Sequence, residues 1–148
     1  MVMRAKPDPT ADLARLLRGH GVQPSAQRVA IAGYVLGTGE HPSADQVLER
    51  VRASFPMVSR ATVYNTLHLL VEKGLLRELV LAKDKVVYDP KLKRHHHFVD
   101  EESGAIHDIP WGALQVSRVG SLAGYDVREY QVVLRGRRRG SGSRTAER

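Results

Sequence analysis

Residues 59–76 read SRATVYNTLHLLVEKGLL and are the most informative segment about the architecture of the protein. Ser59 is a preferred residue for the start of a helix, and Gly74 for its end. Between them, apolar residues recur at helical spacing on one face. The apolar runs Leu75 to Leu81 and Val86 to Tyr88 follow, separated by a charged turn, and predict a β-hairpin. A helix followed by such a hairpin is typical of a winged helix-turn-helix, whose second helix enters the major groove of DNA.

Three further helices are predicted upstream of this stretch. The first covers Ala11 to Arg18 and stops at paired glycines. Ser25 caps the second, which runs to Leu36. The third begins at Ser43, where Gln46 completes a capping box, and continues to about Phe55. Together with the hairpin, these helices predict an N-terminal DNA-binding domain.

The predicted recognition helix carries polar residues opposite its apolar face. Arginine and asparagine can bond base edges or phosphates, and a tyrosine ring can contact thymine methyl groups. Two residues early in the second helix are candidates for phosphate contacts that orient the domain. The candidate DNA-binding residues are Gln27, Arg28, Arg60, Thr62, Tyr64 and Asn65. Any solvated helix face offers similar side chains, so the following hairpin and the basic charge are what favour DNA.

Amino-acid composition limits the classes of binding partner and the kinds of metal or redox site that the protein can have. The 148 residues carry a net charge of +7, which favours a polyanionic partner, and the whole excess lies in residues 1–80 and 137–148. The absence of cysteine excludes disulfides, iron–sulfur clusters and thiolate zinc sites. No stretch approaches the length of a membrane span, and the N-terminus lacks the apolar core of a secretory signal. We therefore expect a cytoplasmic protein without a membrane partner.

Beyond Pro90 the sequence changes to β-type patterns. Strands are expected at His97 to Val99, at Ala105 to Ile109 and over the long run Tyr125 to Leu134. A short helix is expected at about Trp111 to Val119. The composition of the tail RGRRRGSGSRTAER cannot form a core, and the tail is expected to be disordered.

A cluster of histidines and carboxylates is the second candidate site. In a strand, alternate residues share a face, so His95 and His97 point the same way and can bind one ion. Asp89 precedes them by six residues, and Asp108 follows across the expected hairpin. His41 is a candidate ligand from the helical half. Three imidazoles and two carboxylates suit iron(II), manganese(II) or zinc(II).

Other interpretations of these residues stay open at this level. The histidine run can be a polar surface stretch, and spacing alone does not bring His41 to the other four residues. A metalloenzyme could use such ligands, but no general base, nucleophile or substrate pocket is evident beside them. A metal-independent DNA-binding protein is the third option.

Several motifs in order resemble one known family across about residues 11–136. They are GHGVQPSAQR, EHPSADQVL, SRATVYNTLHLLVEKGLL, VVYDP, HHHFVDEESGAIHDIP and GYDVREYQVVLRG. This succession is similar to the ferric-uptake-regulator (Fur) family of metal-dependent repressors. The resemblance implies an α+β protein, with a winged helix followed by a small α/β dimerisation domain and a metal site at the hinge.

The resemblance also assigns residues and partners. By position, the hinge ligands fall on His41, Asp89, His95, His97 and Asp108. The family's DNA contacts fall on Arg60 and Tyr64, with Gln27 and Arg28 at the DNA backbone. A homodimer bound to a palindromic, A·T-rich double-stranded operator is implied, with one regulatory divalent metal per subunit and no enzymatic activity. Iron(II) or manganese(II) is the expected ion, and zinc(II) is possible in vitro.

Particular residues favour particular branches of that family. An aspartate at Asp108 resembles the peroxide-sensing branch, where iron(II) activates peroxide and histidine ligands are oxidised, here His41 or His95. The cysteine-free chain and the HHH run also resemble the iron-response (Irr) regulators, which respond to haem, and this is the alternative. The two CxxC pairs of the family are absent, so no structural zinc is expected. Arg94 and His96 occupy two positions of the family's further metal site, which is therefore incomplete.

The expected organisation is a DNA-binding domain at 1–83, a hinge at 84–90, a dimerisation and metal-sensing domain at 91–136 and a basic tail at 137–148.

Overall fold

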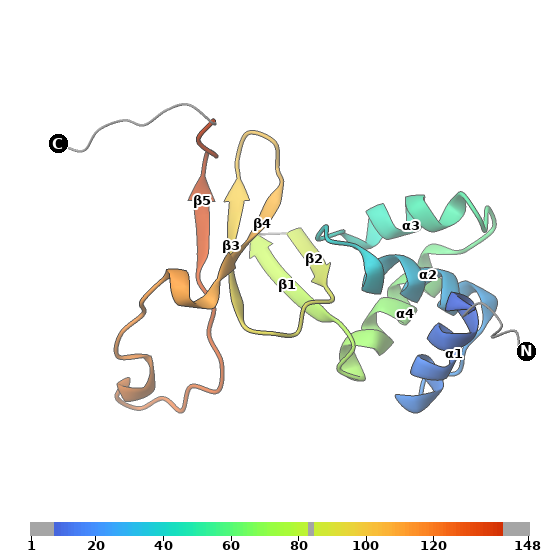
Figure 1. The fold of residues 1–148 in the computed structure, drawn as a ribbon, viewed down its shortest axis with the longest axis horizontal. Helices are drawn as coiled ribbons and strands as arrows, with labels where there is room; N and C mark the ends of the chain where they lie inside the picture. Colours follow the sequence, from blue (N-terminus) through green and yellow to red (C-terminus); the bar gives the residue numbers. More distant parts are fainter. Residues whose placement is uncertain (1–7, 83–84, 141–148) are drawn as a thin grey trace, which may run out of the picture. The chain divides into compact units, whose positions relative to one another are not determined.

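The computed structural model describes residues 8–82 and 85–140. The chain divides into two compact units, Met1–Leu92 and Lys93–Arg148. Among the described residues, no helix combines the length and apolar character needed to cross a bilayer. The expected α+β class, a winged helix-turn-helix followed by a smaller domain, is confirmed (Figure 1).

The first unit contains four helices and a hairpin. They are α1 (Pro9–Gly19), α2 (Ala26–Gly37), α3 (Ala44–Arg52), α4 (Arg60–Glu72), β1 (Arg77–Ala82) and β2 (Lys85–Asp89). β1 and β2 pair antiparallel and form the wing directly after α4 (Figure 1). Because β2 pairs within this unit, most of the segment expected as a hinge, 84–90, is a strand of the wing.

Side chains cap the helices as the sequence predicts. The Ser25 hydroxyl accepts from the Arg28 amide, and the Ser59 hydroxyl accepts from the Thr62 amide. Ser43 and Gln46 form the complete capping box at the start of α3. The helix ends three residues short of the expected Phe55, since a turn occupies 53–54.

One apolar core holds the helices of the first unit together. Each helix contributes fully buried side chains, among them Leu17, Ile31, Val47 and Leu67. The core extends to Tyr88 of β2, which links the wing to the helices. This burial fixes the orientation of α4 and leaves its opposite face to solvent.

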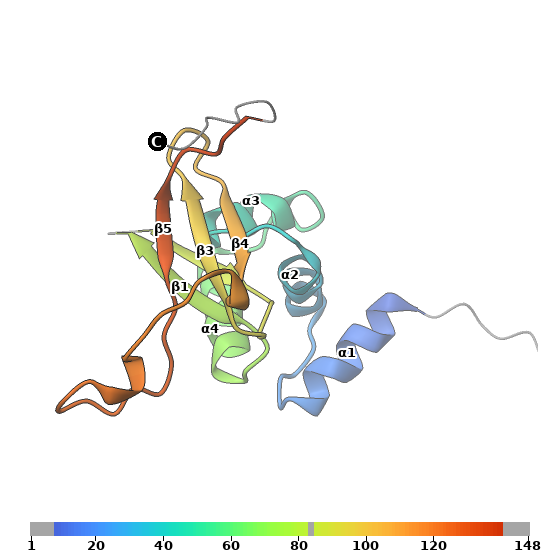
Figure 2. The same ribbon diagram turned by 60° about the vertical axis from the view of Figure 1, so that its left-hand side comes forward.

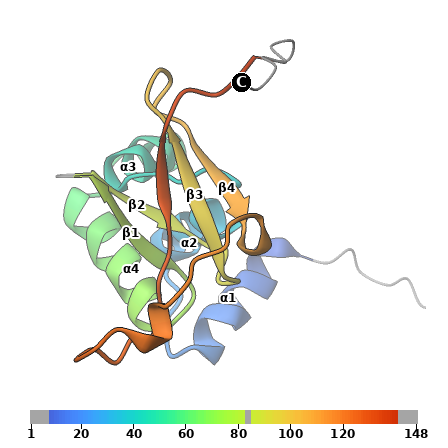
Figure 3. The same ribbon diagram turned by 90° about the vertical axis from the view of Figure 1, so that its left-hand side faces the viewer.

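The second unit is built on a three-stranded sheet. Its strands are β3 (His95–Asp100), β4 (Ile106–Pro110) and β5 (Val133–Gly136). β3 lies in the middle, antiparallel to β4 and parallel to β5 (Figure 3). The register places His97 opposite Asp108 on β4 and opposite Val133 on β5.

Two expectations for the second unit are wrong. The helix expected at Trp111 to Val119 is only two 3₁₀ turns, η1 (Trp111–Ala113) and η2 (Val119–Ser121). The strand expected over Tyr125 to Leu134 shrinks to β5. Figure 2 shows the segment between β4 and β5 extending away from the strands as an irregular loop. Most of this loop is exposed, so it has little tertiary packing to stabilise a helix or strand.

Candidate metal centre and DNA-facing helix

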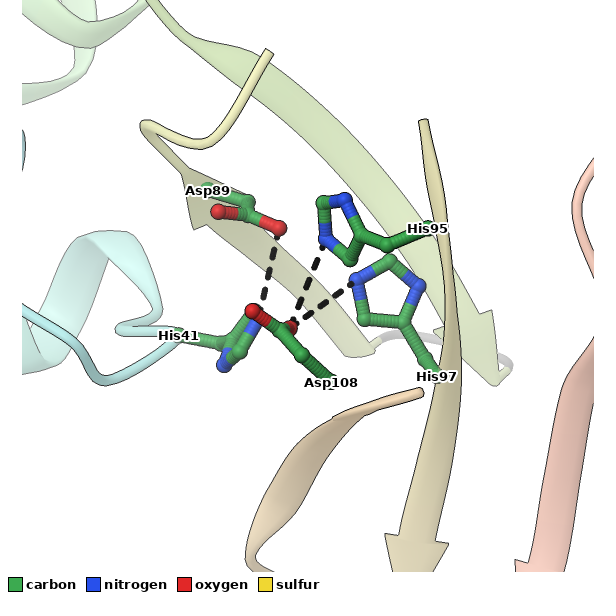
Figure 4. Close-up of side chains that lie close together, drawn as sticks. All are labelled: His41, Asp89, His95, His97 and Asp108. Atoms are coloured by element: carbon green, nitrogen blue, oxygen red, sulfur yellow. Dashed lines mark ion pairs between the residues drawn. The ribbon is translucent and has the colours of Figure 1, made fainter. Parts of the chain in front are cut away.

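The first unit brings two of the expected ligands together, His41 and Asp89. The Tyr88 amide donates to the Pro42 carbonyl at 2.9 Å, so the loop before α3 is tied to the end of β2. His41 precedes Pro42 and Asp89 follows Tyr88, and this bond therefore places them as neighbours. His41 Nε2 lies 3.3 Å from Asp89 Oδ2, and each side chain is 4% exposed (Figure 4).

Local hydrogen bonding orients the Asp89 carboxylate. Its Oδ1 atom accepts from the Lys91 amide at 2.9 Å. The other oxygen, Oδ2, is the one that faces His41. One carboxylate oxygen is thus used to fix the side chain, and the second is directed at the imidazole.

The second unit brings the other three expected ligands together. Asp108 Oδ1 lies 3.4 Å from His95 Nε2 and 3.8 Å from His97 Nε2 (Figure 4). The cause is the register, because directly opposed residues of an antiparallel pair share a face and alternate residues of one strand do too. Both histidines are buried, and the Asp108 side chain is 31% exposed.

Backbone and side-chain acceptors set the two imidazoles for metal binding. His95 Nδ1 lies 2.6 Å from the Lys93 carbonyl, and His97 Nδ1 lies 2.9 Å from Gln131 Oε1. Each carbonyl oxygen can only accept, so each Nδ1 donates a hydrogen bond and is occupied by it. The Nε2 atoms of both rings lie on the side of Asp108. This is the arrangement that metal-ligating histidines adopt.

Donor spacing within each unit fits a bound divalent ion. Ligand atoms about 2.0–2.2 Å from a zinc-like ion lie about 3 to 3.6 Å from one another. The separations of 3.3 and 3.4 Å lie within that range, and the separation of 3.8 Å is slightly longer, so His97 and Asp108 would have to approach each other slightly. Imidazole and carboxylate donors suit manganese, iron or zinc.

Gln131 was missed by the sequence reasoning, although it orients a candidate ligand. It lies just before β5, which runs parallel to β3 in the structure. A polar residue directly before a short apolar run gives no sign of its partner, because the pairing of β3 with β5 is long-range.

His96 lies apart from the other two histidines of the run. It is buried, and its Nδ1 accepts from the Val132 amide at 3.0 Å. Its ring stacks on Trp111 with 4.5 Å between ring centroids, and the Arg94 guanidinium lies 5.0 Å from the Trp111 ring. Arg94 and His96 thus belong to an aromatic and cationic stack, where the resemblance expected an incomplete metal site.

The exposed side of α4 carries three of the candidate DNA-binding residues. Arg60, Tyr64 and Asn65 are exposed, with Ala61 and His68 on the same side. Thr62 is half-buried, and its hydroxyl lies 2.9 Å from the Ser59 hydroxyl at the helix start. Thr62 therefore belongs to the cap and is less available to DNA than its neighbours.

The two candidate residues on α2 are half-buried. Arg28 donates from Nη1 to the Gln23 carbonyl at 3.1 Å, and Gln27 precedes it in the first turn. The Arg28 guanidinium keeps other N–H groups for a phosphate. In the wing, burial raises the pKa of Tyr88, with Glu78 and Tyr64 adding to the effect, so Tyr88 stays a neutral phenol.

Comparison with known proteins agrees with this architecture. The model of the ferric uptake regulator family matches residues 19–133. The chain belongs to the ferric uptake regulator family. It is 30% identical over 122 residues to the peroxide-responsive repressor PerR of Staphylococcus aureus, covering 81% of this chain and 82% of that one. The resemblance to Fur proteins near the PerR branch is therefore confirmed.

Solved structures share the fold. The Campylobacter jejuni peroxide stress regulator superposes with a TM-score of 0.63 at 23% identity, over 91% of this chain and 99% of that one. The Francisella tularensis ferric uptake regulator, solved with iron, gives a TM-score of 0.67 at 24% identity, over 79% and 92% of the chains. At these identities the likeness concerns the fold.

Proposed function

We propose that this protein is a homodimeric, metal-dependent transcriptional repressor in which one divalent ion per subunit controls DNA binding. We call His41 and Asp89 of the first unit the first half-site, and His95, His97 and Asp108 of the second unit the second half-site. These five residues are the proposed ligands. The observation that supports the proposal is that each unit places imidazole nitrogens 3.3 to 3.8 Å from a carboxylate oxygen, within a chain of the Fur family.

Neither half-site has enough protein ligands for a typical closed site. The first offers one imidazole and one carboxylate, and the second offers two imidazoles and one carboxylate. His95 follows Asp89 by only six positions, and such a segment spans at most about 20–22 Å when fully extended. Closing a loop that short carries a small entropy cost, so both halves can bind one ion.

Shared ligation would link the metal to DNA affinity. When bound, the ion supplies the Lewis-acid centre that accepts all five donors. The ligands of both units would then be held in one arrangement. Because α4 belongs to the first unit, its orientation would be fixed as well. DNA affinity rises only as far as the ion binds this arrangement more tightly than others.

The second unit offers a surface for the partner subunit. Four of its large apolar side chains are exposed in the single chain: Val116, Leu122, Tyr125 and Leu134. Apolar side chains gathered in one small domain favour self-association. A two-fold dimer presents two copies of α4 to a palindromic operator, which the family likeness suggests is A·T-rich. We expect the metal-free protein to remain a dimer in light scattering, and a metal-free monomer would contradict this.

Peroxide is the signal we propose. The Staphylococcus aureus relative that is 30% identical to this chain is a peroxide-responsive repressor. We expect the iron-loaded protein to gain oxygen on His41 or His95 after peroxide and to release DNA. Peptide mass spectrometry checks this, with the manganese-loaded protein as control. Unmodified histidines after loss of DNA binding would contradict it.

Haem response is the alternative, but the HHH run does not act as a unit. His96 is bonded to Val132 and stacked on Trp111, apart from the faces of His95 and His97. Titration with haem followed at the Soret band separates the two signals.

The proposal also implies a regulator rather than an enzyme, acting in the cytoplasm without a structural zinc.

DNA retardation tests the proposed function directly. Metal-stripped protein is given iron(II), manganese(II) or zinc(II), and binding to an operator selected from random duplexes is measured. We expect retardation only with metal, and its loss in His97→Ala. His20→Ala is the matched control, because His20 is the C-cap of α1 and bonds the Leu16 carbonyl, away from the five proposed ligands. Equal retardation without metal would contradict the proposal.

A further inference from the structure

Asp45 contacts the two side chains of α4 that are best placed to reach DNA. Its Oδ1 atom accepts from Arg60 Nη1, and also from the Tyr64 hydroxyl at 3.4 Å. The side chains of Asp45 and Arg60 are each 62% exposed, and Tyr64 is 42% exposed. An acidic group thus stands among cationic and aromatic groups on the face expected to meet a polyanion.

The fold fixes this contact from both sides. Asp45 follows the Ser43 cap of α3 by two residues, where the Ser43 amide donates to Gln46 Oε1 at 2.9 Å. Arg60 follows the Ser59 cap of α4, where the Ser59 hydroxyl accepts from the Thr62 amide at 3.0 Å. Both backbones are therefore held at their helix starts, and the shared core of α3 and α4 keeps these starts together.

A carboxylate in this position has two physical effects on an arginine. The guanidinium is a planar fork of five donors, so bonding one nitrogen to a carboxylate orients the plane and leaves other donors for a base edge. The same pairing neutralises a cation that would otherwise bind any phosphate. Orientation raises discrimination between bases, and neutralisation lowers sequence-independent affinity.

We propose that Asp45 is a positioning residue for DNA recognition, which orients Arg60 and Tyr64 for base contacts and reduces the affinity of this face for DNA of any sequence. The inference rests on the proposed DNA-binding function and adds a specificity determinant that lies on α3 instead of the recognition helix.

A purely structural role for Asp45 predicts a different outcome. Exposed ion pairs contribute little to folding, so removing this one should leave thermal unfolding almost unchanged. If Asp45 acted only through net charge, its removal would strengthen binding to every sequence by the same factor. The ratio of specific to non-specific affinity, and its salt dependence, separate these cases from positioning.

The experiment uses the full-length metal-loaded protein, with Asp45→Asn and Asp45→Ala as variants. Asp12→Asn is the matched control, since Asp12 also lies in the first turn of a helix, is exposed and pairs with an arginine, Arg15. Affinity is measured at several salt concentrations for a selected operator and for an unrelated duplex of the same length.

For Asp45→Ala we expect the specificity ratio to fall about tenfold, the scale of one lost base contact. Non-specific binding should tighten, and its log–log salt slope should steepen by about one, as for one added phosphate contact. The specificity ratio of Asp45→Asn should lie between those of the wild type and Asp45→Ala, because an amide still accepts a hydrogen bond but carries no charge. Asp12→Asn should keep the wild-type ratio.

An unchanged ratio in both Asp45 variants would overturn the inference, as would an equal change on both duplexes. Wild-type protein that prefers no sequence would refute the proposed function together with the inference. A selective wild type with unchanged Asp45 variants would refute only the role of Asp45.

Discussion

At the scale of single residues, alternation along β3 divides the roles of three consecutive histidines. His95 and His97 face Asp108, while His96 bonds the Val132 amide and stacks on Trp111. The period of two in a strand was enough to predict this division from sequence. What sequence could not supply is the partner of each ring nitrogen, because these partners come from distant segments.

His96→Phe separates packing from ligation. The new ring can still stack on Trp111, but the half-buried Val132 amide loses its acceptor. We expect stability to fall by about 1–3 kcal/mol, the cost of an unsatisfied donor, with metal affinity unchanged. Denaturant unfolding and metal titration check this. His97→Phe is the comparison and should abolish tight metal binding, so a similar loss in His96→Phe would show that His96 is a ligand.

Gln131 is expected to tune the metal through His97. Gln131→Leu removes the acceptor that holds the proton on His97 Nδ1. Loss of such a partner typically lowers metal affinity about 10- to 100-fold, and we expect that range by competition with a chelator. Gln131→Glu retains an acceptor and should bind metal at least as well as Gln131→Leu. Wild-type affinity in Gln131→Leu would contradict the assigned role.

At the scale of elements, the turn between β3 and β4 depends on one carboxylate. Asp100 accepts from the Ser103 hydroxyl at 2.8 Å and from the Glu102 amide at 3.0 Å. The Ser103 hydroxyl is the largest cause that holds the pKa of Asp100 below its ordinary 3.8, followed by the Glu102 amide. The folded state thus binds this proton less tightly than the unfolded state does.

Asp100 should therefore stabilise the fold in a pH-dependent way. Its contribution is complete above the ordinary pKa of 3.8 and is lost as pH falls through the lower folded value. Asp100→Asn should be less stable than wild type at neutral pH, with the difference shrinking in acid. Denaturant unfolding from neutral pH to pH about 3 checks this. Glu101→Gln, the same charge change beside the turn, is the control, and a difference independent of pH would contradict the account.

The helix starts could be predicted from sequence because the residues that determine them are close together in the chain. Ser25, Ser43 and Ser59 cap their helices as expected, because a cap depends only on the next three residues. The loop between β4 and β5 was predicted wrongly for the opposite reason. Its apolar spacing resembles a helix and a long strand, but within this chain little packs against it, and local pattern does not decide such segments.

At the scale of the whole molecule, the five proposed ligands are divided between two compact units that are adjacent in sequence. The residue types of the donor set could be predicted from spacing, because strand alternation and one hairpin explain His95, His97 and Asp108. The pairing of His41 with Asp89 could not, since it depends on the bond between the Tyr88 amide and the Pro42 carbonyl, across much of the first unit.

The central claim is that one ion binds ligands of both units and thereby controls DNA affinity. Linkage makes this claim quantitative, because metal must raise operator affinity by the same factor by which operator raises metal affinity. Isothermal titration of manganese(II) into the protein, alone and bound to operator, measures that factor directly. We predict that operator DNA raises the metal affinity of the wild type by about 5- to 150-fold, the same factor by which metal raises operator affinity. For His41→Ala we predict that operator DNA leaves the metal affinity unchanged. Metal affinity that is unaffected by operator DNA, or full coupling in His41→Ala, would contradict the account.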